Sequence, residues 1–261
     1  MKSGLTILFL LIGFGIHAQD FDRYEKKEFY VDGKLLRYRI LYPEQFDRSK
    51  SYPLIIFLHG AGQWGSDNEK QLLHAGDFFL VDSVRKKFQA IVILPQCPRG
   101  QSWSYFQFKW DSAERRILLF FPYQEQPSIN ESLVKKLSDS LVQARLVDSH
   151  QIYLGGLSMG AFGVFDMITR YPGYFAAAFP ICGGGNTQMA SRIAGKTALW
   201  IFHGSADPLV NVNLSRNYYQ ALKNLGGDVK YTEYPGVRHN SWDNAFAEPQ
   251  LIPWLFSHRI Q

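Results

Sequence analysis

In Ile152-Tyr153-Leu154-Gly155-Gly156-Leu157-Ser158-Met159-Gly160 a β-rich run passes through a G-x-S-x-G sequence into a helical pattern, which is the strongest indication of the fold. The pentapeptide alone is a weak signal, since roughly 0.1 chance matches are expected in a chain of this length. Its context strengthens it, because a strand, a tight turn and a helix form the setting of a nucleophile elbow. Glycines on both sides let the two backbones approach, and the turn strains the serine backbone. We therefore predict that Ser158 is a nucleophile.

The rest of the chain alternates strand-like and helix-like patterns. Asp32-Gly33 lies between two β-rich runs within 29–42 and predicts a hairpin. Wholly apolar runs typical of parallel strands buried on both faces occur at 54–58, 90–94, 152–154, 176–181 and 198–202, and a more polar, edge-like run at 230–234. Helical patterns follow a capping box formed by Ser128 and Glu131, and also cover 158–171 and 214–225. The alternation predicts a mostly parallel α/β sheet flanked by helices and led by an antiparallel hairpin.

A serine hydroxyl needs a general base, and a histidine base needs an orienting carboxylate. Asp207 follows the 198–202 run and His239 follows the 230–234 run, so both are expected at the same sheet edge as Ser158. The order Ser, Asp, His is the one typical of this kind of fold. We predict Ser158, Asp207 and His239 as a catalytic triad. The competing groups are assigned other roles: Asp228 to a turn, Asp243 to a position too close to His239 in sequence, and His59 and His203 to structural hydrogen bonds at strand ends.

The sequence His59-Gly60-Ala61-Gly62 follows the first apolar run. We predict that the N–H groups of Ala61 and Met159 form an oxyanion hole, with Gly62 as the alternative to Ala61. In a helix that begins at Met159, the N–H groups of the first turn point toward this oxyanion hole. A plain turn at 59–62 is the other interpretation.

Residues 100–127 are long, aromatic and without a regular pattern. This segment follows a strand on the side where α/β proteins bind ligands, so it is expected to be a lid or a binding wall, or else an insertion packed on the surface. We also predict Trp64, Trp103 and Trp242 as substrate-binding residues.

Composition narrows the class of protein. The chain is 46% hydrophobic and 20% charged, as expected of a globular domain, and 15% aromatic. Its formal charge of +5 is spread without a basic stripe, so nucleic-acid binding is not expected. Residues 1–18 have the layout of a secretory signal peptide, with cleavage after Ala18, and no later segment is apolar enough to span a bilayer. We predict an exported, periplasmic or extracellular protein with one domain over 19–261; the alternative for residues 1–18 is an uncleaved N-terminal anchor.

Taken together, the motifs resemble those of secreted bacterial esterases, the feruloyl-esterase and dienelactone-hydrolase-like branch of the α/β-hydrolases. The resemblance rests on these sequences: His59-Gly60-Ala61-Gly62 with Ser66-Asp67-Asn68, Pro95-Gln96-Cys97-Pro98 with Trp103, the 156–160 pentapeptide, His203-Gly204 with Asp207, and His239-Asn240-Ser241-Trp242. It implies a sheet of about eight strands and carboxylesterase activity, often on ester-decorated polysaccharides, without a metal or cofactor. In that fold the strands before Cys97 and Cys182 are not adjacent, so both thiols are expected to be free.

Two other functions stay open at this stage. A serine peptidase related to prolyl oligopeptidases would share the fold and the triad, although this chain has no propeller or other gating domain. A carbohydrate-binding protein on an inactive hydrolase scaffold would not react with a fluorophosphonate probe. The acyl group, the alcohol and the oligomeric state are not determined by the sequence.

Overall fold

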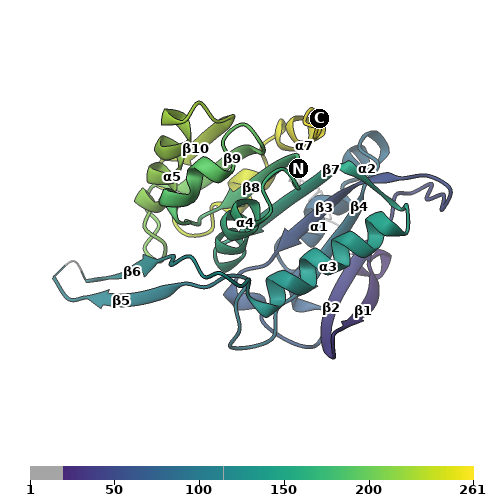
Figure 1. Ribbon diagram of the computed structural model, residues 1–261, viewed down its shortest axis with the longest axis horizontal. Helices are drawn as coiled ribbons and strands as arrows, with labels where there is room; N and C mark the ends of the chain where they lie inside the picture. The colour runs from purple at the N-terminus through teal and green to yellow at the C-terminus, as the bar shows by residue number, and fades with distance from the viewer. Residues whose placement is uncertain (1–19, 114) are drawn as a thin grey trace, which may run out of the picture.

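A computed structural model describes residues 20–113 and 115–261, and the predicted signal peptide lies outside this part. Its centre is an eight-stranded sheet in the order β1-β2-β4-β3-β7-β8-β9-β10 (Figure 1). The strands are β1 (Glu25–Val31), β2 (Lys34–Leu41), β3 (Tyr52–Leu58), β4 (Ile91–Gln96), β7 (Val147–Leu157), β8 (Ala177–Ile181), β9 (Ala198–Gly204) and β10 (Val229–Tyr234). Strand β2 runs antiparallel to β1 and β4, and the pairs from β4 through β10 are parallel. The predicted α/β-hydrolase sheet with its N-terminal hairpin is confirmed.

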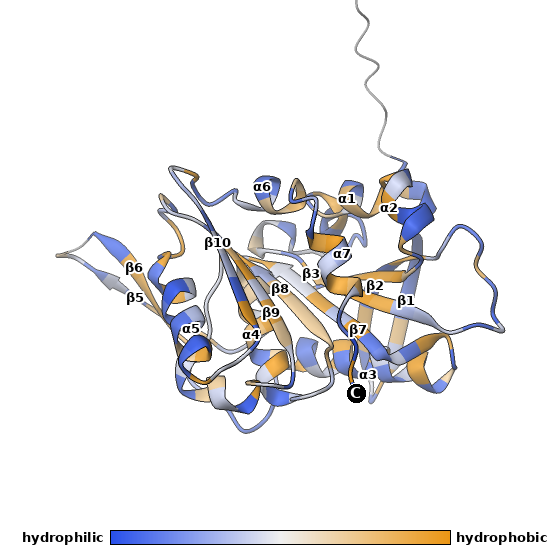
Figure 2. Ribbon diagram, turned by 90° about the horizontal axis from the view of Figure 1, so that it is seen from above, coloured by the Kyte–Doolittle hydropathy of each residue, from blue (hydrophilic) through white to orange (hydrophobic). Residues whose placement is uncertain are grey.

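Helices cover both faces of the sheet, as the edge-on view of Figure 2 shows. They are α1 (Gly76–Leu80), α2 (Asp82–Lys87), α3 (Ile129–Gln143), α4 (Met159–Arg170), α5 (Asn213–Asn224), α6 (Trp242–Phe246) and α7 (Leu251–Phe256). Alternate residues of β3 enter two separate cores: Leu54 and Ile56 pack with α3, α4 and α5, while Ile55 and Phe57 pack with α1, α6 and α7. Burial on both faces explains why this strand is a continuous apolar run.

Local signals explain where several elements begin and end. The hairpin turn places Asp32 at φ 51° and Gly33 at φ 70°, the left-handed pair that a two-residue turn requires. Helix α3 begins after Ser128, whose hydroxyl accepts the N–H of Glu131 at 3.1 Å. The Glu131 carboxylate is fully buried and lies 3.4 Å from Arg170 Nε of α4, so this part of the predicted capping box also joins two helices.

The carboxyl ends of β3 and β7 lie against the start of α4. A Cβ added to Gly160 would lie 1.9 Å from the carbonyl oxygen of Leu58, the last residue of β3. Glycine is therefore required at this position, because no side chain fits between the helix and the strand end. This close approach sets the loop after β3 directly beside the strand-to-helix turn.

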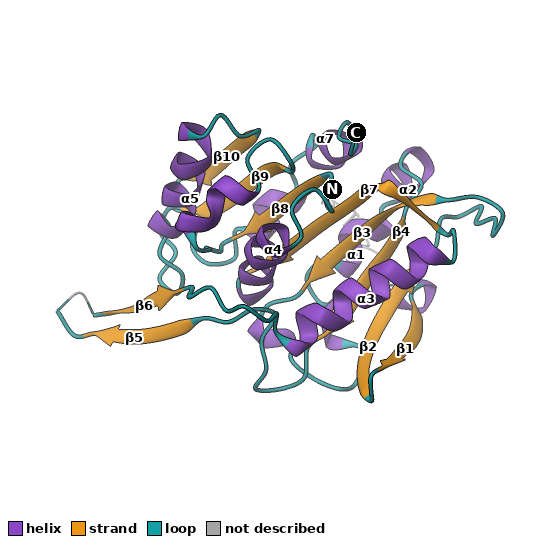
Figure 3. Ribbon diagram, viewed as in Figure 1, coloured by secondary structure: helices purple, strands orange, loops and turns teal. Residues whose placement is uncertain are grey.

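Residues 100–127 differ from the irregular segment that the sequence suggested. Their centre is an antiparallel two-stranded ribbon, β5 (Gln107–Asp111) and β6 (Arg116–Phe120), which projects away from the rest of the protein (Figures 1 and 3). Phe108 and Trp110 are 71% and 59% exposed. At the base, Phe106 and Phe121 pack on Phe162 of α4 with ring centroids 5.3 and 5.1 Å away.

Cys97 and Cys182 are buried free thiols, as predicted. They follow β4 and β8, which are separated in the sheet by β3 and β7. Among the described helices, none combines the length and the apolar character needed to cross a membrane.

Candidate active site

Ser158 occupies the turn between β7 and α4. Its φ of 53° and ψ of −118° confirm the strained backbone that the G-x-S-x-G sequence predicts. The turn is held on both sides, because the Ser158 N–H donates to Ile181 O at 2.9 Å and the Ser158 carbonyl accepts from Phe162 N–H at 3.1 Å. Backbone strain at this residue is thus stabilised by the adjacent strand β8 and by the first turn of α4.

The three predicted triad residues meet in one hydrogen-bonded chain. His239 Nε2 lies 3.0 Å from Ser158 Oγ, and His239 Nδ1 lies 2.7 Å from Asp207 Oδ2. A carboxylate only accepts, so Nδ1 carries the hydrogen and Nε2 is free to accept the serine proton. The imidazole is 18% exposed, and the Asp207 side chain is fully buried. This geometry allows proton transfer from the serine hydroxyl to the imidazole.

The Asp207 carboxylate is held in one orientation by several donors. Its Oδ1 accepts the N–H groups of Leu209 at 2.8 Å and Val210 at 3.0 Å. Burial by itself raises the pKa of this carboxyl, but hydrogen bonds from His203, His239 and the Val210 N–H outweigh burial and hold the pKa well below its usual range. Asp207 is therefore a carboxylate at neutral pH.

The loops after β9 and β10 are joined through their backbones. Ala206 N–H donates to Val237 O at 3.0 Å, and Ser205 N–H donates to Tyr234 O at 3.0 Å. A Cβ on Gly204 would lie 2.3 Å from Val237 O, so the loops touch where β9 ends. This contact fixes the separation of the two loops that carry Asp207 and His239.

The predicted oxyanion residues lie on adjoining segments. Ala61 begins a short 3-10 helix, Ala61–Gln63, after β3, and Met159 is the first residue of α4. A first-turn N–H has no acceptor within its own helix. His59 fixes the loop as predicted: its Nδ1–H donates to Gly60 O at 2.7 Å, and its Nε2 accepts Cys97 N–H at 2.9 Å. Burial lowers the pKa of His59 to about 4.

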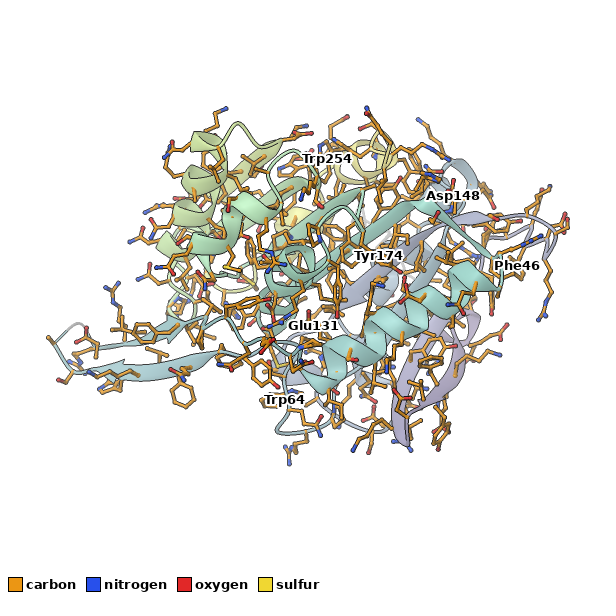
Figure 4. All side chains as sticks on the ribbon, viewed as in Figure 1. Phe46, Trp64, Glu131, Asp148, Tyr174 and Trp254 are labelled. Atoms are coloured by element: carbon orange, nitrogen blue, oxygen red, sulfur yellow. The ribbon has the colours of Figure 1, made fainter. Side chains whose placement is uncertain are left out.

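The three predicted substrate-binding tryptophans have different environments. Trp242 packs against the His239 ring at 5.6 Å and against His74 at 4.8 Å, which places it beside the triad. Trp64 is partly exposed in the loops beyond β3, at the end of the protein opposite Trp254 in Figure 4. Trp103 is fully buried, and its Nε1–H donates to His59 O at 2.9 Å. The prediction for Trp103 is therefore wrong, because this side chain supports the loop after β3 and is closed to a substrate.

One residue at the site was not predicted. Cys182 follows β8 with φ 46°, and its thiol lies within 4.8 Å of ligand atoms of Asp207 and His239. The sequence signal was a Cys-Gly-Gly-Gly run directly after an apolar strand. Burial raises the pKa of this thiol well above its usual range, with a further contribution from Asp207. A metal ion would need the thiolate and would compete with the Asp207–His239 hydrogen bond.

Comparisons with curated proteins find acyl hydrolases. The chain is 30% identical over 116 residues to acyl-protein thioesterase 1 of Neurospora crassa, covering 42% of this chain and 45% of that protein. It is 30% identical over 133 residues to poly(3-hydroxyalkanoate) depolymerase C of Paucimonas lemoignei, covering 51% of this chain and 28% of that protein. The chain thus matches less than half the length of these two relatives. Acyl-protein thioesterase 1 of Debaryomyces hansenii is 26% identical over 74% of this chain and 87% of its own length.

Solved structures share the architecture. A thermostable esterase superposes with a TM-score of 0.80 at 32% identity, over 92% of this chain and 64% of that chain. A ferulic acid esterase from Anaeromyces mucronatus superposes with a TM-score of 0.62 at 15% identity, over 86% of this chain and 87% of that chain, which is a likeness of fold alone. The sequence profile of the Phospholipase/Carboxylesterase family matches residues 45–250, a range that contains Ser158, Asp207 and His239. The chain belongs to the Phospholipase/Carboxylesterase family of the α/β-hydrolases.

Proposed function

We propose that the protein is a serine-dependent carboxylic ester hydrolase that works through an acyl-enzyme. The observation that carries this proposal is the continuous hydrogen-bonded chain from Asp207 through His239 to Ser158, at 2.7 and 3.0 Å. Membership of a phospholipase and carboxylesterase family supports the same reaction class.

The catalytic steps follow from the geometry. Ser158 Oγ attacks the acyl carbonyl while His239 Nε2 takes the hydroxyl proton. Asp207 keeps Nδ1–H of the same imidazole in place and stabilises the imidazolium that forms. The N–H groups of Ala61 and Met159 stabilise the oxyanion. The proton then passes to the leaving alcohol, and water releases the acid from the acyl-enzyme by the reverse use of His239.

The proposed substrates are small esters or esters that decorate a polysaccharide. Two curated relatives are named as an acyl-protein thioesterase and a poly(3-hydroxyalkanoate) depolymerase, so thioesters and poly(3-hydroxyalkanoates) belong in the same substrate screen. A cavity of about 390 Å³ lies between β6 and the loop after β8, and Phe120, Phe121, Asn186 and Leu214 are among the residues that line it. We place the bulkier part of the ester here, with the β5–β6 ribbon as its wall. Export through residues 1–18 stays a prediction.

The direct test is turnover of p-nitrophenyl acetate by the protein and by Ser158→Ala. Loss of the nucleophile should reduce kcat by about 10⁴-fold or more, while the circular dichroism spectrum stays the same. Ser83→Ala, which alters an exposed serine of α2, is the matched control and should keep full activity. Unchanged turnover in Ser158→Ala would contradict the proposal. Hydrolysis of the matching p-nitroanilide would instead favour a peptidase.

A further inference from the structure

A second histidine contacts the carboxylate that orients His239. His203 is the last residue but one of β9 and is fully buried. Its Nε2 lies 3.2 Å from Asp207 Oδ2, the same oxygen that accepts His239 Nδ1–H. Asp207 Oδ2 is therefore held between two imidazole rings, only one of which touches Ser158.

The contacts of the His203 ring fix its orientation. Nε2 also lies 3.1 Å from Val210 O, so both of its neighbours are oxygens that can only accept. Nε2 must therefore carry a hydrogen, which points into the turn from Asp207 to Val210. Because Val210 N–H also donates to Asp207 Oδ1, His203 holds the same turn that holds the carboxylate.

The opposite nitrogen is locked by helix α5. His203 Nδ1 lies 2.7 Å from Ser215 Oγ, so it can accept the hydroxyl hydrogen when Nε2 carries the ring hydrogen. The same hydroxyl oxygen lies 2.9 Å from Gly183 O. Ser215 is fully buried, so no water competes for the bond to His203. A single hydrogen-bonded series thus runs from Ser215 through His203 and Asp207 to His239.

We propose that His203 is a positioning residue for the proposed hydrolase reaction. It fixes the rotamer of the Asp207 carboxylate so that Oδ2 meets His239 Nδ1 at 2.7 Å. This inference rests on the proposed function, and it assigns to His203 a role beyond the structural hydrogen bond at a strand end that the sequence suggested.

Several charged or titratable groups surround this pair. Asp207 lies on the loop after β9, and His239 lies on the loop after β10. Glu233 of β10 is paired in register with His203, and the Cys182 thiol follows β8 beside Asp207. Glu233 is engaged by Arg216 at 2.6 Å, so Asp207 is the carboxylate that the His203 Nε2–H reaches.

Two amide variants distinguish the roles of the two nitrogens of the His203 ring. The amide nitrogen of His203→Gln can take the place of Nε2 and donate to the Asp207 turn. The shorter amide of His203→Asn can reach only the place of Nδ1, beside Ser215. Loss of a buried hydrogen bond to a charged group should lower kcat of His203→Asn about 10- to 100-fold. Its KM should change less than about twofold, since no bound substrate contact is lost.

The pH profile supplies a readout that a packing defect would not change. In His203→Asn the Asp207 carboxylate loses a donor and keeps more of its negative charge for the His239 imidazolium, so the acidic limb of kcat/KM moves to higher pH. His203→Gln should keep the limb in place and keep kcat within about threefold of the parent. Equal losses in the Gln and Asn variants, with an unmoved acidic limb, would overturn the proposal.

A second measurement keeps the inference independent of the substrate. The downfield NMR resonance of His239 Nδ1–H, assigned by its loss in His239→Asn, should persist in His203→Gln and broaden or shift in His203→Asn. Should either His203 variant fail to fold, Ser215→Ala should give a smaller shift in the same direction. An unchanged resonance in all three overturns the proposal even if the protein hydrolyses esters. If the expected NMR changes occur but the protein hydrolyses no ester, only the proposed function is contradicted.

Discussion

The loops at the carboxyl edge of the sheet and the β5–β6 ribbon differ in how they are held. At the sheet edge, backbone hydrogen bonds join neighbouring loops, and the side chains of Asp207 and Trp103 are completely buried. On the ribbon, Phe108, Trp110 and Ile117 are exposed at 71%, 59% and 40%, and they share one face of the two strands. A two-stranded ribbon is marginally stable alone, so this one depends on its packing at Phe106 and Phe121.

The residues expected to carry the chemistry and those expected to carry the substrate specificity therefore lie in different regions of the protein. Side chains at the strand ends are fixed by short, buried contacts, as proton transfer requires. The exposed side chains of the ribbon are not fixed in this way, which suits a surface that contacts varied substrates.

Asp207→Asn should have the largest effect on activity. It keeps the shape of the side chain but removes the charge that holds His239 Nδ1–H in place, so kcat should fall about 10³- to 10⁴-fold. Steady-state kinetics with p-nitrophenyl acetate measure this loss. A variant that retains a tenth of the parent kcat would show that another group orients His239.

Trp103→Ala and Trp110→Ala make the same change, tryptophan to alanine, at the sheet edge and on the ribbon. Trp103 is fully buried and donates to His59 O, so its removal should lower the unfolding free energy by about 3–5 kcal/mol. Trp110 is 59% exposed on the ribbon, and its removal should change that free energy by less than about 0.5 kcal/mol. Urea denaturation of both variants gives the values. Similar losses in the two variants would remove the distinction between the regions.

His59→Gln should change the pH dependence of stability. The native pKa of His59 is about 4 because the ring is buried, while the unfolded chain binds a proton near pH 6.5. The unfolded state is therefore favoured as pH falls from 6.5 toward 4, by up to about 3 kcal/mol. Glutamine can still accept Cys97 N–H but does not titrate, so the variant does not lose stability through this site as the pH falls. The difference between the free energies of unfolding of parent and variant should therefore shrink as the pH falls. Parallel curves between pH 7 and 4.5 would contradict this account.

Phe108→Ala with Trp110→Ala should have the smallest effect, confined to large substrates. If the ribbon is a binding wall, KM for a feruloyl or polymeric ester should rise about three- to tenfold, equal to about 1 kcal/mol. Turnover of p-nitrophenyl acetate should stay the same. Tyr30→Ala, which removes an exposed aromatic ring from the edge strand β1, is the matched control. An unchanged KM for every bulky ester would show that the ribbon does not contact substrate.

Sequence patterns predicted the sheet edge well because its residues follow strict local rules. Apolar runs gave the buried strands, and the glycines around Ser158 predicted a turn whose φ of 53° the structure shows. The ribbon was missed although β5 alternates polar and aromatic residues, because β6 is a nearly continuous apolar run without alternation and both strands are short. Trp103 was misassigned because burial depends on contacts with His59 and Gly163, which lie far away in sequence.

The proposed nucleophile can be tested without knowing the substrate. A fluorophosphonate probe reacts with a serine only where a neighbouring base and an oxyanion hole activate it. Mass spectrometry of the labelled protein should show one adduct, located on the peptide that contains Ser158 and absent from Ser158→Ala. Labelling at another residue, or none in the folded parent protein, would contradict the assignment of Ser158 as the nucleophile.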